Sequence, residues 1–126
     1  VYHYYAYSSK DQRYLKKAED AYLTSIKREK RYFKPVMNLA LFYYFNADPK
    51  KTESFVNKSL KDFPQYHRLW MVKALVEYNK LGKHDAAIES AKTTFSLGRN
   101  KNTYEFYQSL QAGRKFDIEQ EEVFFK

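Results

Sequence analysis

The fold is decided by residues 78–88, which read YNKLGKHDAAI. Gly82 lies in this stretch, and glycine readily takes the left-handed conformation that ends a helix. We expect one helix over 69–78, which Gly82 stops, and another over 85–97, with Gly98 just beyond its end. The stretch therefore predicts two helices joined by a short turn.

Helix signals continue towards the N-terminus. Serines can cap a helix, and proline or an Asp-Pro pair suits a first turn. These signals stand at Ser8, Ser9, Pro35, Asp48 and Pro49. The helix after the serines is expected to bury a stripe spaced at three and four residues: Tyr14, Ala18, Ala21, Tyr22, Ser25 and Ile26. Phe63-Pro64 ends the helix that Asp48 starts.

The C-terminal part is expected to hold a seventh helix. Asn102 stands three residues before Glu105, which is the spacing of a capping box, and Gly113 closes the helix. We expect a short eighth helix within 114–126. No segment predicts a strand, because β-branched content is low and no clean alternation persists.

Small residues recur at a nearly fixed period, which is typical of stacked helical hairpins. The intervals are 34 or 35 residues in Ala6/Ala40, Ala18/Thr52/Ala87, Ser25/Ser59/Thr94, Tyr22/Val56/Ala91 and Tyr43/Tyr78.

This pattern resembles the tetratricopeptide repeat (TPR) family, whose motif is 34 residues long. The family's small-residue positions fall on Ala6, Ala18 and Ser25 in the first repeat and on Ala40, Thr52 and Ser59 in the second. Pro64 matches the proline that often ends a repeat, and residues 78–88 resemble the turn between helices. Leu75 and Lys30 depart from the motif. The resemblance covers roughly residues 1–112 and implies partner binding in a groove lined by each repeat's first helix.

We therefore predict an all-α fold of antiparallel hairpins stacked as a right-handed TPR-like superhelix. Residues 1–113 would form three hairpins and a further helix, and 114–126 a C-terminal cap. Because the sequence begins with Val1, we expect an excised domain or a processed product.

Composition excludes several classes of site. The chain has 126 residues, a net charge of +8 and no cysteine, so disulfides, thiolate nucleophiles and Cys-ligated metals are excluded. Its longest apolar run, 36–45, is about half of the roughly 20 residues that a membrane-spanning helix needs. His3, His67 and His84 are scattered, and no phosphate loop or nucleophile elbow is present. We expect no enzyme activity, no metal and no cofactor.

Two groups of residues are candidates for partner binding. Mapped onto the family's geometry, the groove contains Tyr7, Met37, Asn38, Leu41, Tyr44, Lys73, Val76 and Lys80, with His3, Tyr4, Phe45 and Val72 on the same face. A basic patch consists of Lys27, Arg28, Lys30, Arg31 and Lys34. Its cations complement a helix C-terminus, and they also suit an anionic partner.

The sequence thus predicts a noncatalytic module that binds a peptide or helix in its groove, within a larger protein or assembly. One alternative is binding of RNA or another anionic partner through the basic face. Another, by analogy alone, is a soluble appendage of a membrane enzyme such as a surface-glycan ligase. We expect a soluble domain, with the cytoplasm as the favoured compartment.

Overall fold

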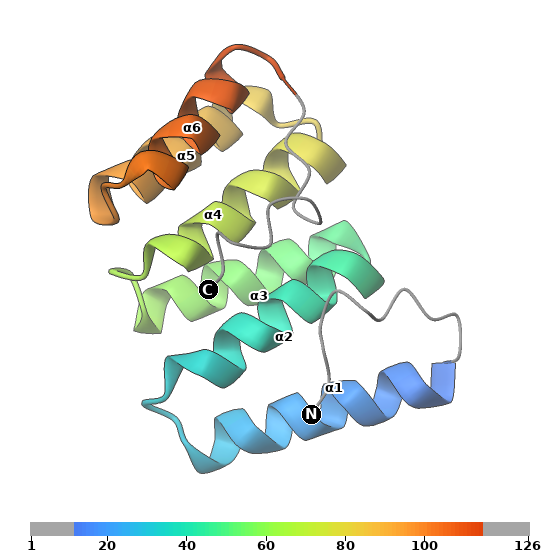
Figure 1. The fold of residues 1–126 in the computed structure, drawn as a ribbon. Coiled ribbons are helices and arrows are strands. Elements are labelled where there is room, and N and C mark those ends of the chain that lie inside the picture. The colour runs from blue at the N-terminus through green and yellow to red at the C-terminus, as the bar shows by residue number, and fades with distance from the viewer. Residues whose placement is uncertain (1–11, 115–126) are drawn as a thin grey trace.

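A computed structural model describes residues 12–114, and all regular secondary structure in that range is helical (Figure 1). The helices are α1 (Gln12–Arg28), α2 (Phe33–Asn46), α3 (Pro49–Asp62), α4 (His67–Leu75), the π-helix η2 (Val76–Lys80), α5 (His84–Leu97) and α6 (Lys101–Gln111). The expected all-α class is confirmed for this part of the chain. Ala6, the Ser8/Ser9 cap and the eighth helix lie outside the described residues.

Several helix ends follow directly from local chemistry. Asp48 caps α3 by accepting a hydrogen bond from the Lys50 backbone N–H at 2.7 Å, and Pro49 is the first helical residue. Phe63 is the C-cap of the same helix. Gly82 has a φ of 67°, which glycine adopts without the steric penalty of a side chain. These ends were correctly predicted.

The start of α6 was predicted wrongly. The cap is Asn100, whose side chain accepts from the Thr103 backbone N–H at 2.9 Å. The Thr103 hydroxyl accepts in return from the Asn100 N–H at 3.1 Å. A threonine three residues after Asn100 therefore closes the box, and the helix begins earlier than a cap at Asn102 would allow.

The helix expected over 69–78 differs at both ends. It begins as α4 at His67 and becomes π-helical at Val76. The Leu81 N–H donates to the Val76 carbonyl at 3.0 Å, which is the i→i+5 bond of a π-helix. This wider turn accommodates one more residue than an α-helical turn.

Each helix packs against the next one along the chain, and α2 also contacts α4. Consecutive helices run in opposite directions, so the loops 29–32, 63–66 and 98–100 lie along one edge, at the left of Figure 1. The hairpins α2–α3 and α4–α5 both begin at this edge.

Most of the described residues that lie one period apart are buried to a similar degree. Ala18, Thr52 and Ala87 are at most 1% exposed. Also buried are Tyr22, Val56, Ala91, Ala40, Leu75, Ser59 and Thr94. Ala21 and Ser25, expected in the buried stripe of α1, are exposed. Among the described helices α1 packs chiefly on α2, so only one side of it is covered.

Candidate functional site

A cavity of about 570 Å³ lies between the N-terminal halves of α2 and α4, and we call it the α2–α4 cavity. The described residues that line it are Arg31, Tyr32, Phe33, Lys34, Met37, Asn38, Leu41, Tyr66 and Arg68. Three of the predicted groove residues therefore meet two residues of the predicted basic patch at one site.

The floor of this cavity is apolar. Met37 and Leu41 are one helical turn apart on α2, so they share a face, and they are 7% and 1% exposed. Asn38 lies beside them, is partly exposed, and supplies an amide that can both donate and accept. A mostly apolar cavity with a few polar groups is typical of ligand pockets.

Aromatic rings form one wall. Phe33 and Tyr66 stack with ring centroids 3.9 Å apart and planes 13° apart, and Phe63 packs against both rings. Tyr32 also lines the cavity but is 53% exposed. The first three rings thus stabilise one another, while the Tyr32 ring is available to a partner.

The rim is positively charged. Arg31 and Lys34 are exposed, Arg68 is partly exposed, and no Asp or Glu is among the described residues lining the cavity. Lys34 and Arg68 are the second residues of α2 and α4, and neither helix has a side-chain cap. Helix N-termini carry partial positive charge and unpaired N–H groups. The cavity therefore combines an apolar floor with an anion-attracting rim.

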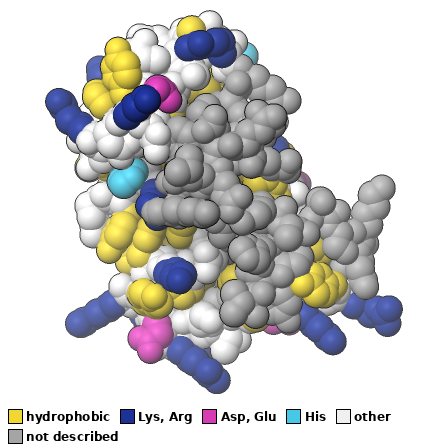
Figure 2. Space-filling model, in the orientation of Figure 1, with side chains coloured by type: hydrophobic (Ala, Val, Ile, Leu, Met, Phe, Trp, Pro, Cys, Tyr) yellow, Lys and Arg dark blue, Asp and Glu magenta, His cyan; other side chains and the backbone are white. Residues whose placement is uncertain are grey.

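The other members of the basic patch lie outside this cavity. Lys27 and Arg28 are in the last turn of α1, where cations complement the helix dipole. Lys30 lines a separate cavity of about 300 Å³ between α1 and α3, together with Lys58. Lys and Arg side chains project along the left edge of the molecule in Figure 2, and others project at its lower right.

Three predicted groove residues lie elsewhere and make internal contacts. Tyr44 is buried, its hydroxyl accepts from the Asn79 amide at 2.9 Å, and the Lys80 ammonium lies 4.8 Å from its ring centroid. Val76 is 1% exposed. None of these three is among the described residues that line the α2–α4 cavity. Tyr7 lies outside the described residues.

Lys73 is held by a polar network between helices. Its ammonium donates to Asn57 Oδ1 on α3 at 3.0 Å and to Glu77 Oε2 at 3.2 Å. Glu77 is 4% exposed and accepts at Oε1 from the Ser90 hydroxyl on α5 at 2.7 Å. A buried carboxylate requires such partners. These contacts tie α3, η2 and α5 together.

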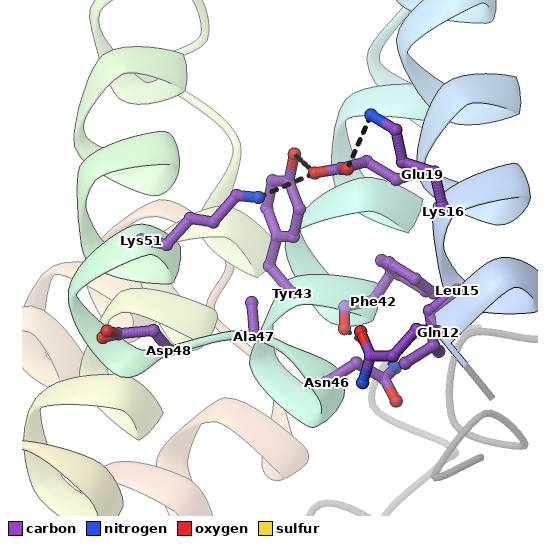
Figure 3. A pocket seen from close by; sticks show the side chains of 10 residues that line it. All are labelled: Gln12, Leu15, Lys16, Glu19, Phe42, Tyr43, Asn46, Ala47, Asp48 and Lys51. Carbon is purple, nitrogen blue, oxygen red and sulfur yellow. Dashed lines mark hydrogen bonds and ion pairs between the residues drawn. The ribbon is translucent and has the colours of Figure 1, made fainter. Parts of the chain in front are cut away.

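A smaller cavity of about 250 Å³ lies beside α1, α2 and the start of α3 (Figure 3). Glu19 Oε2 accepts from the Tyr43 hydroxyl at 2.6 Å and from the Lys51 ammonium at 2.9 Å. Burial by itself would raise the pKa of Glu19, but these two hydrogen bonds and the charges of Lys51 and Lys16 lower it overall. Burial, the bond to Glu19 and its charge raise the pKa of Tyr43 above its usual 10.0.

This second arrangement joins three helices through the carboxylate of Glu19. The ionised Glu19 is satisfied by donors from Tyr43 and Lys51, as Figure 3 shows. It therefore stabilises the packing of α1, α2 and α3. Sequence reasoning missed it because the three residues are far apart in the chain.

Sequence reasoning also missed Tyr32, Phe33, Tyr66 and Arg68, although a signal for some of them exists. Tyr32 and Tyr66 are 34 residues apart, and so are Lys34 and Arg68. If the 34-residue period had been extended to the loops before α2 and α4, it would have matched these residues on neighbouring hairpins.

Comparison with models of known families, with curated proteins and with solved structures found no match. Within residues 12–114, no three His, Asp or Glu side chains come together as a metal site. The same residues contain no helix with the length and apolarity to cross a membrane.

Proposed function

We propose that this chain is a noncatalytic interaction module of TPR-like hairpins in a right-handed stack, and that it binds a polypeptide segment in the α2–α4 cavity. The observation that carries the proposal is the position of this cavity at the start of two successive hairpins. Its lining comes from matched places, the loops before α2 and α4 and the first turns of both helices.

The stacked arrangement is supported by the packing. The helices α2 and α4, each the first of a hairpin, contact one another as well as their own partners. Two sets of residues one period apart in α1, α3 and α5 are buried alike, Ala18/Thr52/Ala87 and Tyr22/Val56/Ala91. Nearest-neighbour packing of equivalent units is the physical basis of a helical repeat.

The choice of a polypeptide is supported by the chemistry of the cavity. Its volume lies within the roughly 300–1,000 Å³ range of ligand sites, which is ample for one or two bulky side chains. Met37 and Leu41 would contact an apolar side chain, and the Asn38 amide would bind the backbone of an extended segment. Tyr32 is an exposed aromatic of the kind enriched in binding hot spots.

Site-specific cross-linking tests the proposal. The chain has no cysteine, so Gln65→Cys introduces a single thiol at an exposed position next to Tyr66 of the cavity lining, without replacing a lining residue. Labelled with a photo-cross-linker, it should capture a polypeptide, whereas Ser54→Cys on the exposed side of α3 should not. Asn38→Trp in the Gln65→Cys background should fill the cavity and abolish the cross-link.

The Ser54→Trp variant is the matched control for steric effects, since it adds the same ring at an exposed position. Circular dichroism establishes that each variant is folded. Equal cross-linking in the Asn38→Trp and Ser54→Trp variants would show that binding occurs elsewhere and would overturn the proposal.

A further inference from the structure

The net charge of the molecule is concentrated at one edge. Residues 27–34, 58–68 and 99–101 surround the three loops at the left of Figure 1, and we call them the loop edge. They contain ten Lys and Arg and two Asp and Glu. Their net charge of +8 equals that of the whole chain, so all the other residues together are neutral.

Several cations elsewhere have ion-pair partners, whereas most of those at the loop edge do not. Among residues 12–114, the ion pairs of 2.9–3.4 Å use Lys16, Lys51, Lys73 and Lys83, none of which belongs to the loop edge. No ion pair with a described residue is formed by Lys27, Arg28, Lys30, Arg31, Lys34, Lys58 or Lys61. The positive field at this edge is therefore not cancelled locally.

Helix electrostatics explains only part of the edge, the cations Lys27, Arg28 and Lys61 in the last turns of α1 and α3. Lys34, Arg68 and Lys101 lie in the first turns of α2, α4 and α6, and none of these turns contains an acidic residue. A cation in a first turn is opposed by the helix dipole. Residues that oppose the local preference of a helix are expected at functional sites.

We propose that the loop edge recognises an acidic polypeptide, a segment whose bulky apolar side chain enters the α2–α4 cavity while flanking Asp and Glu pair with Arg31 and Lys34. This inference rests on the proposed function and names the class of partner. Carboxylates would also accept from the uncapped N-terminal N–H groups of α2 and α4. The remaining cations accelerate encounter with a segment of opposite charge.

The geometry favours a polypeptide over a single-stranded nucleic acid. Proteins that bind single-stranded nucleic acid present a continuous basic groove in which exposed aromatic rings stack on successive bases. Here Phe33 and Tyr66 cover each other, and Tyr104 packs against Phe95, whose ring lies beside the Arg99 guanidinium. The basic residues are also divided between the α1–α3 cavity and the α2–α4 cavity.

Fluorescence anisotropy with the full chain tests the inference. The probe is a labelled dodecapeptide with a central Leu-Phe flanked by Glu on both sides. The comparison probes replace every Glu by Gln, replace Leu-Phe by Ser-Ser, or consist of a labelled uridine dodecamer. The Arg31→Gln/Lys34→Gln variant is compared with Lys17→Gln/Lys50→Gln, which removes the same charge from two exposed lysines away from the loop edge.

The acidic Leu-Phe probe should bind at low salt, and Arg31→Gln/Lys34→Gln should weaken it about tenfold, because two exposed charge pairs are lost and each contributes about threefold. The control variant should change affinity less than about twofold, because its charges are screened at that distance. The Gln probe and the Ser-Ser probe should both bind about tenfold more weakly.

The outcomes separate this inference from the proposed function. Equal binding of the Glu and Gln probes overturns the acidic partner and leaves the cavity as a peptide site. Equal binding of the Leu-Phe and Ser-Ser probes shows that charge alone acts, which overturns both. Tighter binding of the uridine probe than of the acidic peptide assigns the edge to nucleic acid and also overturns both.

Discussion

The contact between Gly98 and His67 shows how closely the C-terminus of α5 approaches the start of α4. A Cβ placed on Gly98 would lie 2.4 Å from Cγ and Nδ1 of His67. Gly98 has a φ of −133°, which any residue can adopt, so glycine is required here by space. Gly82 is the opposite case, with a φ of 67° and no atom within 4 Å of the place that a Cβ would occupy.

We expect Gly98→Ala to lower the free energy of unfolding by roughly 1–3 kcal/mol, because the new methyl group overpacks against the imidazole. Urea unfolding monitored by circular dichroism measures the loss. In a His67→Ser background the same substitution should cost much less. If the loss is the same in both backgrounds, the His67 contact is not its cause.

His67 should also make stability depend on pH. Burial lowers its pKa below the usual 6.5, and the neighbouring Arg68 charge lowers it further. The unfolded chain therefore binds a proton more readily than the folded chain, so the stabilisation is complete above pH 6.5 and is lost as the pH falls below it. We expect the free energy of unfolding to decrease between about pH 7.5 and pH 5.5.

The His67→Gln variant is the control for this decrease, since the other two histidines remain. Its free energy of unfolding should fall less over the same interval. This interval lies above the pKa of Glu19, which is lowered from 4.5, so Glu19 does not contribute. Parallel pH profiles for the two proteins would contradict the assignment to His67.

Helix ends could be predicted from sequence where one residue determines them. Asp48 caps α3 and Gly82 follows η2 because each supplies its own conformational or hydrogen-bonding chemistry. Asn100 and Asn102 are equally good caps in isolation, and the Thr103 hydroxyl decides between them. The π-helix was not predicted, because no residue type within 76–80 enforces an i→i+5 bond.

The contact surfaces of helices can be tested with a neighbouring pair of alanines. Ala87 on α5 is fully buried, while Ala86 is exposed. We expect Ala87→Leu to lower the thermal midpoint, at a cost of roughly 1–3 kcal/mol, because the added atoms have no space. Ala86→Leu should leave the midpoint nearly unchanged. Equal midpoints for the two variants would refute the assigned orientation of α5.

The assembled site could be predicted only in part. The resemblance to the TPR family implied that Met37, Asn38 and Leu41 share one face of a helix, and the structure brings them into one cavity. The resemblance could not show that Lys73 is bound to Asn57 and Glu77, because that depends on how three helices are packed. The three cavity residues differ from Lys73 in how the helices around them pack, and no local sequence pattern encodes that packing.

Lysines at opposite ends of helices should have opposite effects on the free energy of unfolding. Lys34 lies in the first turn of α2 and Lys27 in the last turn of α1, so the two helix dipoles act on them with opposite sign. We expect Lys34→Gln to raise the free energy of unfolding by roughly 0.3–1 kcal/mol and Lys27→Gln to lower it by a similar amount. Urea unfolding at low salt measures both.

High salt should reduce both differences, because screening weakens exposed charges. A loss of stability in Lys34→Gln would mean that this lysine supports the fold, and it would contradict the inference that Lys34 is kept for binding.

The turn at Gly82 has a consequence for how this chain accommodates hairpins of different length. Hairpin starts are 34 residues apart from Phe33 to His67, but the second helices start 35 residues apart, at Pro49 and His84. An extra residue in an α-helix rotates everything after it by about 100°. The first helices of the two hairpins, Phe33–Asn46 and His67–Lys80, are equally long, so the extra residue lies in the connection at 81–83, where Gly82 turns the chain. The difference in length is therefore confined to a turn, and α5 still presents Ala87 and Ala91 to the core.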